Sequence, residues 1–275
     1  MPAGYAALKG SFRSLYGSYL LRSGDFSAFQ KQHALIVAFH RVNDDLEDTL
    51  TCSRTKFLRF CRFFKRHFDV VSLSDLVENV TSGNSVAGKL VITFDDGYRD
   101  NFQYAAPILK SQNLPATFFI TSGFIGNNNT AWWDQGAKPA PSWMEWEEVL
   151  LLRKAGFSIG SHTMHHANLG TTTALEAWRE IVDSKKTLEH QLNMPVDLFA
   201  YPYGGKTNFN EEARELVKRA GYSCCLSCHG GIVAPNSDPF SLNRVAISEW
   251  QNRPEQLIMD VVREAATLSS KQQSR

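Results

Sequence analysis

The sequence predicts an α/β protein built on a parallel sheet, because short apolar runs alternate with segments of helical periodicity. The apolar runs cover residues 35–39, 90–94, 116–120, 157–159, 198–201 and 222–226. Helical periodicity lies between them at 56–68, 73–79, 104–112, 146–155, 173–192 and 211–220. Continuous apolar strands that alternate with helices are typical of a parallel sheet covered by helices. A barrel and an open sheet both fit, and in both the functional groups lie beyond the carboxyl ends of the strands.

Composition and charge exclude several classes of protein. The 275 residues are 43% hydrophobic with a formal net charge of +1, which excludes a disordered chain and argues against a nucleic-acid binder. The longest apolar run, Ala34 to Phe39, is far short of the ~20 residues that cross a bilayer, so we expect no transmembrane segment. The first residues lack the pattern of a secretory signal, and the five cysteines are an odd number. Both observations predict a reducing, cytoplasmic location.

Residues 1–33 differ from the rest and are expected to precede a single domain at 34–275. Apolar residues recur there at steps of three and four: Tyr5, Leu8, Phe12, Leu15, Tyr16, Tyr19 and Leu20. Four basic side chains and one acidic side chain give this segment a net charge of +3. The pattern predicts a basic amphipathic helix, although Gly4, Gly10 and Gly17 weaken it. The helix either packs on the flank of the domain or makes peripheral contact with a membrane surface.

Two carboxylates follow the strand predicted at 90–94. Asp95 and Asp96 come directly after it and precede Gly97. Neighbouring residues at a strand end point in different directions, so one carboxylate can bind a metal while the other handles protons. An Asp-Gly pair is also a common turn signal, and this segment alone fits both interpretations.

Histidines form a second cluster after the strand predicted at 157–159. His162 and His166 are four residues apart and converge on one ion if the residues between them turn helically. His165 faces away on such a turn and is not expected to be a ligand. The alternative is a polar loop in which the histidines are only neighbours in sequence.

A third segment breaks sharply after the strand predicted at 198–201. Pro202 is followed by Tyr203, Gly204 and Gly205, and such a break can present a backbone N–H to an oxyanion. Together the three segments offer one carboxylate and two imidazoles to a divalent cation, a second carboxylate as base, and a backbone donor. Three protein ligands with an open fourth position are typical of a catalytic Zn²⁺ site that hydrolyses acyl groups. Co²⁺, Ni²⁺ and Fe²⁺ suit the same donors.

These segments resemble the motifs of the polysaccharide deacetylases, the NodB-homology or carbohydrate esterase 4 family. Residues 93–97 resemble the first motif of that family, His162, Thr163 and His166 the second, and residues 199–204 the third. The resemblance covers roughly residues 35–247. It implies a distorted (β/α) barrel with an incomplete set of strands. It also implies a metal-dependent hydrolase that removes acetyl groups from N-acetylated amino sugars of a poly- or oligosaccharide.

The resemblance also implies a role for each motif residue. Asp95 becomes the general base, and the Tyr203 backbone N–H becomes the donor to the oxyanion. The ligands of the metal become Asp96, His162 and His166. The metal would lower the pKa of a water molecule, Asp95 would accept its proton, and the products would be acetate and a free amino sugar.

The third motif departs from the family pattern at one position. The family usually has an arginine where this chain has Ala200, so the residue that would orient Asp95 is missing from that place. We expect Arg244 to reach Asp95 from the following strand, with Arg99 as a second candidate.

The general acid also departs from the family pattern. The family's late histidine has no counterpart between Ser241 and Trp250. The stretch 35–42 instead resembles the opening strand of exopolysaccharide deacetylases, in which an early histidine takes that role. We therefore expect His40 to be the acid, with His229 as the fallback.

Aromatic residues are candidates for contact with the sugar. Trp132 and Trp133 lie in a glycine- and asparagine-rich loop after the strand predicted at 116–120, and Tyr201 lies in the third motif. Flat rings at the mouth of a barrel suit the faces of a pyranose. The same tryptophans would equally serve to bury a long loop, and the sequence leaves both interpretations open.

Two alternative functions fit the sequence less well. A non-catalytic glycan-binding relative would explain the two departures, but the presence of Asp95 argues against it because metal binding does not need that carboxylate. A deacetylase or deformylase of a lipid-linked sugar precursor would use residues 1–33 as a membrane dock.

Overall fold

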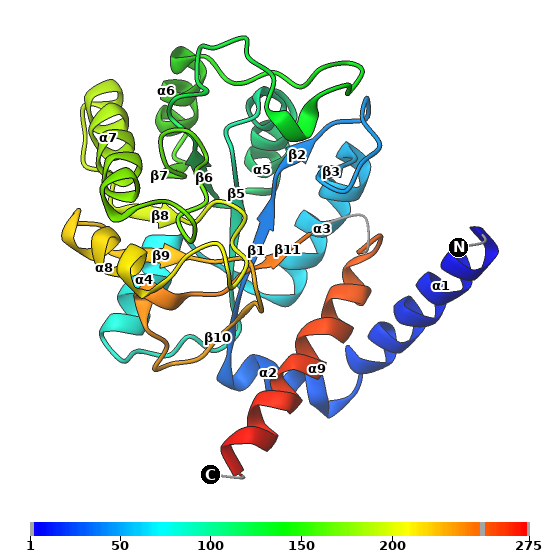
Figure 1. Cartoon of the computed structure of the whole chain (residues 1–275). Coiled ribbons are helices and arrows are strands. Elements are labelled where there is room, and N and C mark those ends of the chain that lie inside the picture. The colour runs from blue at the N-terminus through cyan, green and yellow to red at the C-terminus, as the bar shows by residue number, and fades with distance from the viewer. Residues whose placement is uncertain (1–2, 248–250, 274–275) are drawn as a thin grey trace.

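The protein is built around one curled sheet, and all but one of its strand pairs are parallel (Figure 1). The computed structural model describes the backbone of residues 3–247 and 251–273 and the side chains of residues 10–247 and 251–267. The strands of this sheet are β1 (Ala34–Phe39), β4 (Asp69–Val70), β5 (Lys89–Phe94), β6 (Thr117–Ile120), β7 (Ser158–Ser161), β8 (Leu198–Ala200), β9 (Cys224–Leu226), β10 (Ile232–Val233) and β11 (Val245–Ala246). Their order is β10-β1-β5-β6-β7-β8-β9, with β11 beside β1 and β4 beside β5. A separate parallel pair joins β2 (Arg41–Val42) to β3 (Thr51–Cys52).

The sheet curls far enough for a single segment to join its far strand to β1. Leu242 forms a bridge with Leu226 at the end of β9, and Val245 in β11 pairs with Val37 in β1. Residues 242–246 therefore close the sheet on itself. The result is a distorted barrel with an incomplete set of strands, which confirms the predicted fold class.

Helices pack around the barrel, as the alternating pattern predicts, except that α1 packs on α9. They are α1 (Ala3–Leu20), α2 (Gly24–Gln32), α3 (Arg54–His67), α4 (Leu73–Thr81), α5 (Ala106–Gln112), α6 (Trp146–Lys154), α7 (Ala174–Leu192), α8 (Glu211–Arg219) and α9 (Pro254–Gln273). Their starts follow local chemistry: α7 begins with a capping box in which Thr173 and Glu176 each bind the other's backbone N–H. Each long strand and helix predicted between residues 35 and 226 is present. The two-residue strands were not predicted, because so short a strand has no periodicity to detect. The helix α9 was not predicted either.

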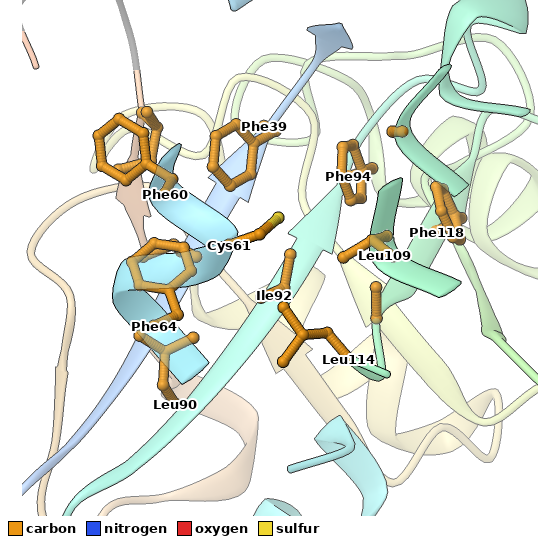
Figure 2. Close-up of a cluster of buried hydrophobic side chains, with 14 of the residues drawn as sticks. Phe39, Phe60, Cys61, Phe64, Leu90, Ile92, Phe94, Leu109, Leu114 and Phe118 are labelled. Atoms are coloured by element: carbon orange, nitrogen blue, oxygen red, sulfur yellow. The ribbon is translucent and has the colours of Figure 1, made fainter. Parts of the chain in front are cut away.

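Both faces of the central strands are buried, which explains their continuous apolar sequences. One face packs under α3 and α5 (Figure 2). On that face the rings of Phe39, Phe94 and Phe118 come from three adjacent strands, with centroids 5.5 and 4.8 Å apart. The other face fills the barrel interior with a second cluster that includes Ile36 and Val91. Along β5, therefore, Phe94 points toward the helices, while its neighbour Thr93 points into the barrel and donates a hydrogen bond to the carbonyl oxygen of Val37 in β1.

The N-terminal segment forms two helices rather than one, and α1 packs along α9 (Figure 1). The contact uses the small and polar face of α1. A Cβ at Gly17 would lie 1.8 Å from the carbonyl oxygen of Glu255, so glycine is required for this close approach. Arg13 forms an ion pair with Asp260 at 2.8 Å, and Gln256 donates to the carbonyl oxygen of Gly10.

The apolar face of α1 therefore points away from α9. Four large side chains on it are exposed: Phe12, Leu15, Tyr16 and Tyr19. Leu20, at the end of the helix, is buried. The side chains of Tyr5 and Leu8, which the sequence places in the same pattern, lie outside the described residues. Within the described part of the chain, no helix combines the length and the hydropathy needed to cross a membrane.

Candidate active site

The three polar segments meet at one edge of the barrel. Asp95 and Asp96 follow β5, His162 follows β7, and Tyr201 follows β8. These strands belong to one parallel run, so their carboxyl ends lie on the same side of the sheet. Side chains that are far apart in sequence therefore converge there.

Left-handed backbone conformations are concentrated in these segments. Among the described residues, six that are not glycine have a positive φ. Two of them, Asn113 and Asn193, end helices, where this conformation is usual. The other four all belong to the three motifs: Asp96, Thr163, His166 and Tyr203. Such conformations cost about 1–3 kcal/mol each and persist where the surrounding structure imposes them, often at functional sites.

Asp96, His162 and His166 form a cluster that fits a metal ion. Their ligand atoms all lie within 4.8 Å of one another, and all three residues are buried. Asp96 Oδ1 is 3.5 Å from His162 Nε2 and 3.3 Å from His166 Nε2, yet it has no hydrogen-bond partner. A buried carboxylate oxygen without a partner is costly, and a bound cation would satisfy it. One carboxylate and two imidazoles are suitable ligands for a divalent metal.

His162 is held in the form that binds a metal. Its Nδ1 lies 2.8 Å from the carbonyl oxygen of Ala200, so Nδ1 donates its proton there and Nε2 keeps a lone pair on the side of Asp96. Burial lowers the pKa of His162 to about 4, which leaves the ring neutral at neutral pH. Burial alone would raise the pKa of Asp96, but the contact with His166 holds it below its usual range. Both groups are thus in the deprotonated forms that metal binding requires.

Asp95 faces the barrel interior, where Arg244 binds both of its oxygens. The distances are 2.7 Å from Nη1 to Oδ1 and 2.8 Å from Nη2 to Oδ2, and both side chains are buried. The guanidinium also donates to Thr93 Oγ1 and to the carbonyl oxygen of Ser227. Burial alone would raise the pKa of Asp95, but the charge of Arg244 holds it below its ordinary value. Asp95 is therefore ionised at neutral pH.

Arg244 reaches Asp95 because of where the barrel closes. It lies in the closing segment, between Leu242, which bridges β9, and Val245, which pairs with β1. Ala200, where the family pattern has arginine, is buried at the end of β8. Arg99, the second candidate, forms an ion pair with Glu148 instead, at 2.9 Å.

The structure brings His40, rather than His229, to the two carboxylates. His40 follows β1, is partly exposed, and lies close enough to lower the pKa of both Asp95 and Asp96. His229 Nδ1 lies 3.1 Å from the carbonyl oxygen of Gly204, and its ring stacks on that of Phe209. His165 is exposed and bonded to Glu180, away from the cluster.

The turn after β8 places Tyr203 beside the metal cluster. The ring of Tyr203 is 43% exposed, and its centroid lies 4.6 Å from that of His166. Within the described residues nothing accepts a hydrogen bond from the Tyr203 N–H. Gly204 allows the turn to pack closely, since a Cβ there would lie 2.4 Å from the backbone nitrogen of Cys228.

Two of the three aromatic residues predicted to contact the sugar lie near the cluster, and the third does not. The ring of Trp133 lies 4.6 Å from that of His166, and Trp132 is 66% exposed. Tyr201 requires a correction, because it is only 1% exposed and its ring stacks on Phe209 with the centroids 4.2 Å apart. Its hydroxyl accepts a hydrogen bond from the Cys225 thiol at 3.1 Å. Tyr201 is a core residue with no surface left for a sugar.

A buried network behind Trp133 was not predicted from the sequence. Trp133 Nε1 donates to the hydroxyl of Tyr98 at 2.8 Å, which donates to Asp134 at 2.6 Å. Arg41 completes the network with an ion pair to the same carboxylate. The sequence signal is an aspartate directly after two tryptophans, which needs a cationic partner once it is buried. That partner lies 93 residues earlier, too far for any local pattern to reveal.

Comparison with known proteins assigns the family. A family model described as polysaccharide deacetylase matches residues 82–225, just over half of the chain. The chain belongs to the polysaccharide deacetylase family, as its motifs predict.

Relatives extend this similarity beyond the matched segment. The protein YxkH of Bacillus subtilis (strain 168) is 30% identical over 159 residues, which are 58% of this chain and 51% of YxkH. This chain thus spans about half the length of that relative. The poly-beta-1,6-N-acetyl-D-glucosamine N-deacetylase of Staphylococcus aureus (strain MRSA252) is 27% identical over 207 residues, which are 72% of this chain and 68% of the relative.

Solved structures share the same fold. The Streptococcus pyogenes deacetylase PplD superposes with a TM-score of 0.71 at 22% identity, over 83% of this chain and 98% of PplD. IcaB from Ammonifex degensii superposes with a TM-score of 0.70 at 20% identity, over 84% of this chain and 97% of IcaB. Both likenesses agree with the distorted barrel described above.

Proposed function

We propose that the protein is a metal-dependent N-deacetylase that removes acetyl groups from N-acetylated amino sugars of a poly- or oligosaccharide and releases acetate. The observation that carries this proposal is the buried triad of Asp96, His162 and His166 beside the ionised carboxylate of Asp95. Membership of the polysaccharide deacetylase family supports it. The S. aureus relatives are named for poly-beta-1,6-N-acetyl-D-glucosamine, so this polymer is the first substrate to test.

The proposed ion is Zn²⁺, with Co²⁺, Ni²⁺ and Fe²⁺ as alternatives that suit the same donors. Asp96, His162 and His166 would hold it. When bound, a divalent ion polarises the acetamide carbonyl and lowers the pKa of a water molecule.

The remaining steps belong to side chains and backbone of the chain itself. Asp95, kept ionised by Arg244, accepts a proton from the attacking water. The Tyr203 backbone N–H donates to the oxyanion that forms on the acetyl carbonyl. His40 then protonates the leaving amine as an imidazolium, so that the amino sugar departs. Trp132 and Trp133, at the rim of the cluster, contact the sugar.

The alternative functions are less well supported. A non-catalytic relative was favoured by the missing arginine at Ala200, but Arg244 occupies both oxygens of Asp95 from another part of the fold. Among the described residues, the exposed apolar face of α1 would suit a lipid-linked precursor, but the S. aureus relatives are named for a glycan polymer, which favours a glycan chain.

The first prediction separates the two aspartates. Asp95→Asn keeps the shape of the side chain but removes the base, so acetate release should fall roughly 1000-fold while the metal stays bound. Asp96→Asn removes a ligand, so the metal and the activity should be lost together. Elemental analysis after dialysis and acetate release from poly-beta-1,6-N-acetyl-D-glucosamine measure the two effects. His165→Asn, at an exposed residue, is the control and should change neither. Substantial activity in Asp95→Asn would show that another group is the base.

The second prediction concerns the pKa of Asp95. Arg244→Lys keeps a positive charge but cannot bind both carboxylate oxygens, so the pKa of Asp95 should rise toward its ordinary value. The base must be ionised, and activity is lost as the pH falls through its pKa. The acidic limb of kcat/KM against pH should therefore move to higher pH. If Arg244 only supported the fold, kcat/KM would fall equally at every pH.

We further propose that α1 makes peripheral contact with a membrane surface. Phe12, Leu15 and Tyr19 are 68%, 72% and 63% exposed, which is unusual for adjacent large apolar side chains. Residues 1–33 carry the net charge of +3 noted above, which would favour anionic lipid.

The third prediction tests this membrane contact by sedimentation with vesicles. The full chain should sediment with vesicles that contain anionic phospholipid, and a Phe12→Ser, Leu15→Ser, Tyr19→Ser variant should stay in the supernatant. Leu151→Ser with Leu175→Ser is the control, because these exposed leucines lie on α6 and α7. Equal sedimentation of both variants would remove the basis for the proposal.

We also propose that the chain works in a reducing, cytoplasmic compartment. All five cysteines lie among the described residues, and all are free thiols, four of them buried. Free thiols are usual where glutathione and thioredoxin keep cysteines reduced. Cell fractionation with an antibody against the chain tests the location.

A further inference from the structure

The two proposed histidine ligands differ in what holds their rings. His162 donates a hydrogen bond from Nδ1 to the carbonyl oxygen of Ala200. His166 Nε2 lies 3.3 Å from Asp96, whereas its Nδ1 is buried and has no hydrogen-bond partner among the described residues. A histidine that binds a metal usually donates its other ring proton, and that hydrogen bond fixes the orientation of the ring. The ring of His166 therefore depends on other contacts for its orientation.

Two aromatic rings hold the imidazole of His166 instead. The ring centroids of Trp133 and of Tyr203 each lie 4.6 Å from that of His166, a separation typical of aromatic pairs. Their planes are inclined to the imidazole by 51° for Trp133 and by 68° for Tyr203. Tyr203 is 43% exposed, whereas Trp133 is bonded to a buried hydroxyl. Trp133 is therefore the ring whose position the fold fixes more firmly.

The indole of Trp133 is fixed by a chain of hydrogen bonds. Trp133 Nε1 donates to the Tyr98 hydroxyl at 2.8 Å, and that hydroxyl donates its only proton to Asp134 at 2.6 Å. An indole nitrogen can only donate and a carboxylate can only accept, so the chain runs in one direction. The Tyr98 hydroxyl thus joins the side chains of two consecutive residues, Trp133 and Asp134. The indole cannot turn without breaking one of these bonds.

Arg41 holds the far end of this chain. Its guanidinium forms a buried ion pair with Asp134 and a second ion pair with Asp48 at 2.8 Å. The central carbon of the guanidinium lies 4.9 Å from the centroid of the Tyr98 ring. Arg41 directly follows His40 at the end of β1, so the network connects the indole to the strand that carries the proposed acid.

Packing alone does not require this network. A buried ion pair costs desolvation free energy, and apolar side chains of similar volume often fill such a space with equal or greater stability. A buried polar network whose groups are all satisfied makes a core rigid and gives it one arrangement. The arrangement that results here is a single orientation of the Trp133 indole against His166.

We propose that Tyr98 is a positioning residue for the metal ligand His166, which it orients through the ring of Trp133. This ring takes the place of the hydrogen bond that His166 Nδ1 lacks. The proposal rests on the proposed function, because it concerns the metal site of that function. A ligand that is already oriented loses less conformational freedom when an ion binds, so a looser indole lowers the affinity for the metal.

The test measures metal binding in the absence of any sugar, so contacts between Trp133 and a substrate do not contribute. Tyr98→Phe removes one hydroxyl and keeps the ring that stacks on Trp143. The dissociation constant for Zn²⁺, measured at pH 7 by competition with a chromophoric chelator, should rise roughly tenfold. The visible absorption of bound Co²⁺ depends on the geometry of its ligands and should change as well.

Tyr222→Phe is the matched control. Tyr222 is buried in another part of the core, and its hydroxyl donates to the carbonyl oxygen of Ile181 at 3.1 Å. Both variants should lower the melting temperature of the metal-free protein, because each loses a buried hydrogen bond. Only Tyr98→Phe should change the affinity for Zn²⁺ and the Co²⁺ spectrum. Trp133→Leu removes the ring itself at a partly exposed position and should weaken Zn²⁺ binding at least as much.

The outcomes separate this proposal from the proposed function. The role of Tyr98 is overturned by a Tyr98→Phe protein that folds and keeps both the Zn²⁺ affinity and the Co²⁺ spectrum, or by an equal change in Tyr222→Phe. Should Tyr98→Phe not fold, unchanged values in Trp133→Leu overturn it. A wild-type protein that binds Zn²⁺ but releases no acetate from any N-acetylated polymer overturns the proposed function, while the metal measurements still decide the role of Tyr98. A wild-type protein that binds no divalent ion overturns both.

Discussion

The bidentate ion pair between Arg244 and Asp95 is the contact on which both the barrel and its site depend. Both side chains are buried, and removing one partner of a buried pair costs about 3–5 kcal/mol because the other charge is left without compensation. Arg244 comes from the segment that closes the sheet between β9 and β1, and Asp95 follows the central strand β5. One contact therefore fixes the closing segment, holds Asp95 in place and keeps it ionised. The same ion pair that closes the barrel therefore also keeps the proposed base in its ionised form.

The remaining geometry follows from strand alternation and from a few strained residues. Along β5, Phe94 packs outward with Phe39 and Phe118 (Figure 2). Its neighbour Thr93 points into the barrel, where its hydroxyl accepts a hydrogen bond from Arg244. The strand ends there, and Asp96 turns into a left-handed conformation that points its carboxylate at the histidines. Left-handed conformations also occur in the other two motifs. At each of the three motifs, packing in the rest of the fold therefore offsets the free-energy cost of the strained backbone. The buried Oδ1 of Asp96, which has no hydrogen-bond partner, is likewise costly in the fold, and a bound cation would satisfy it.

The sequence predicted the parts of this arrangement that are local. Apolar runs revealed the strands, and the metal triad was visible because Asp96 follows a strand directly and His162 and His166 are close in sequence. Contacts across the barrel were harder to predict from the sequence. Arg244 was one of two candidates, because it lies 149 residues from Asp95 in sequence. Only the closed sheet shows that the two side chains are 2.7 Å apart. Burial of Tyr201 was missed because a motif does not show which face of a strand is inside. The helix α1 follows its predicted periodicity, yet Gly10 and Gly17 pack against α9 and its aromatic face is left exposed.

The most direct test of this account is a double-mutant cycle on the free energy of unfolding, measured by urea denaturation of wild type, Arg244→Met, Asp95→Asn and the double variant. If Arg244 and Asp95 form the contact that closes the barrel, each single change should be strongly destabilising, and the double change should cost much less than their sum. The expected coupling energy between the two residues is about 2–3 kcal/mol. Additive effects, with a coupling energy near zero, would contradict it, because the two residues would then act independently.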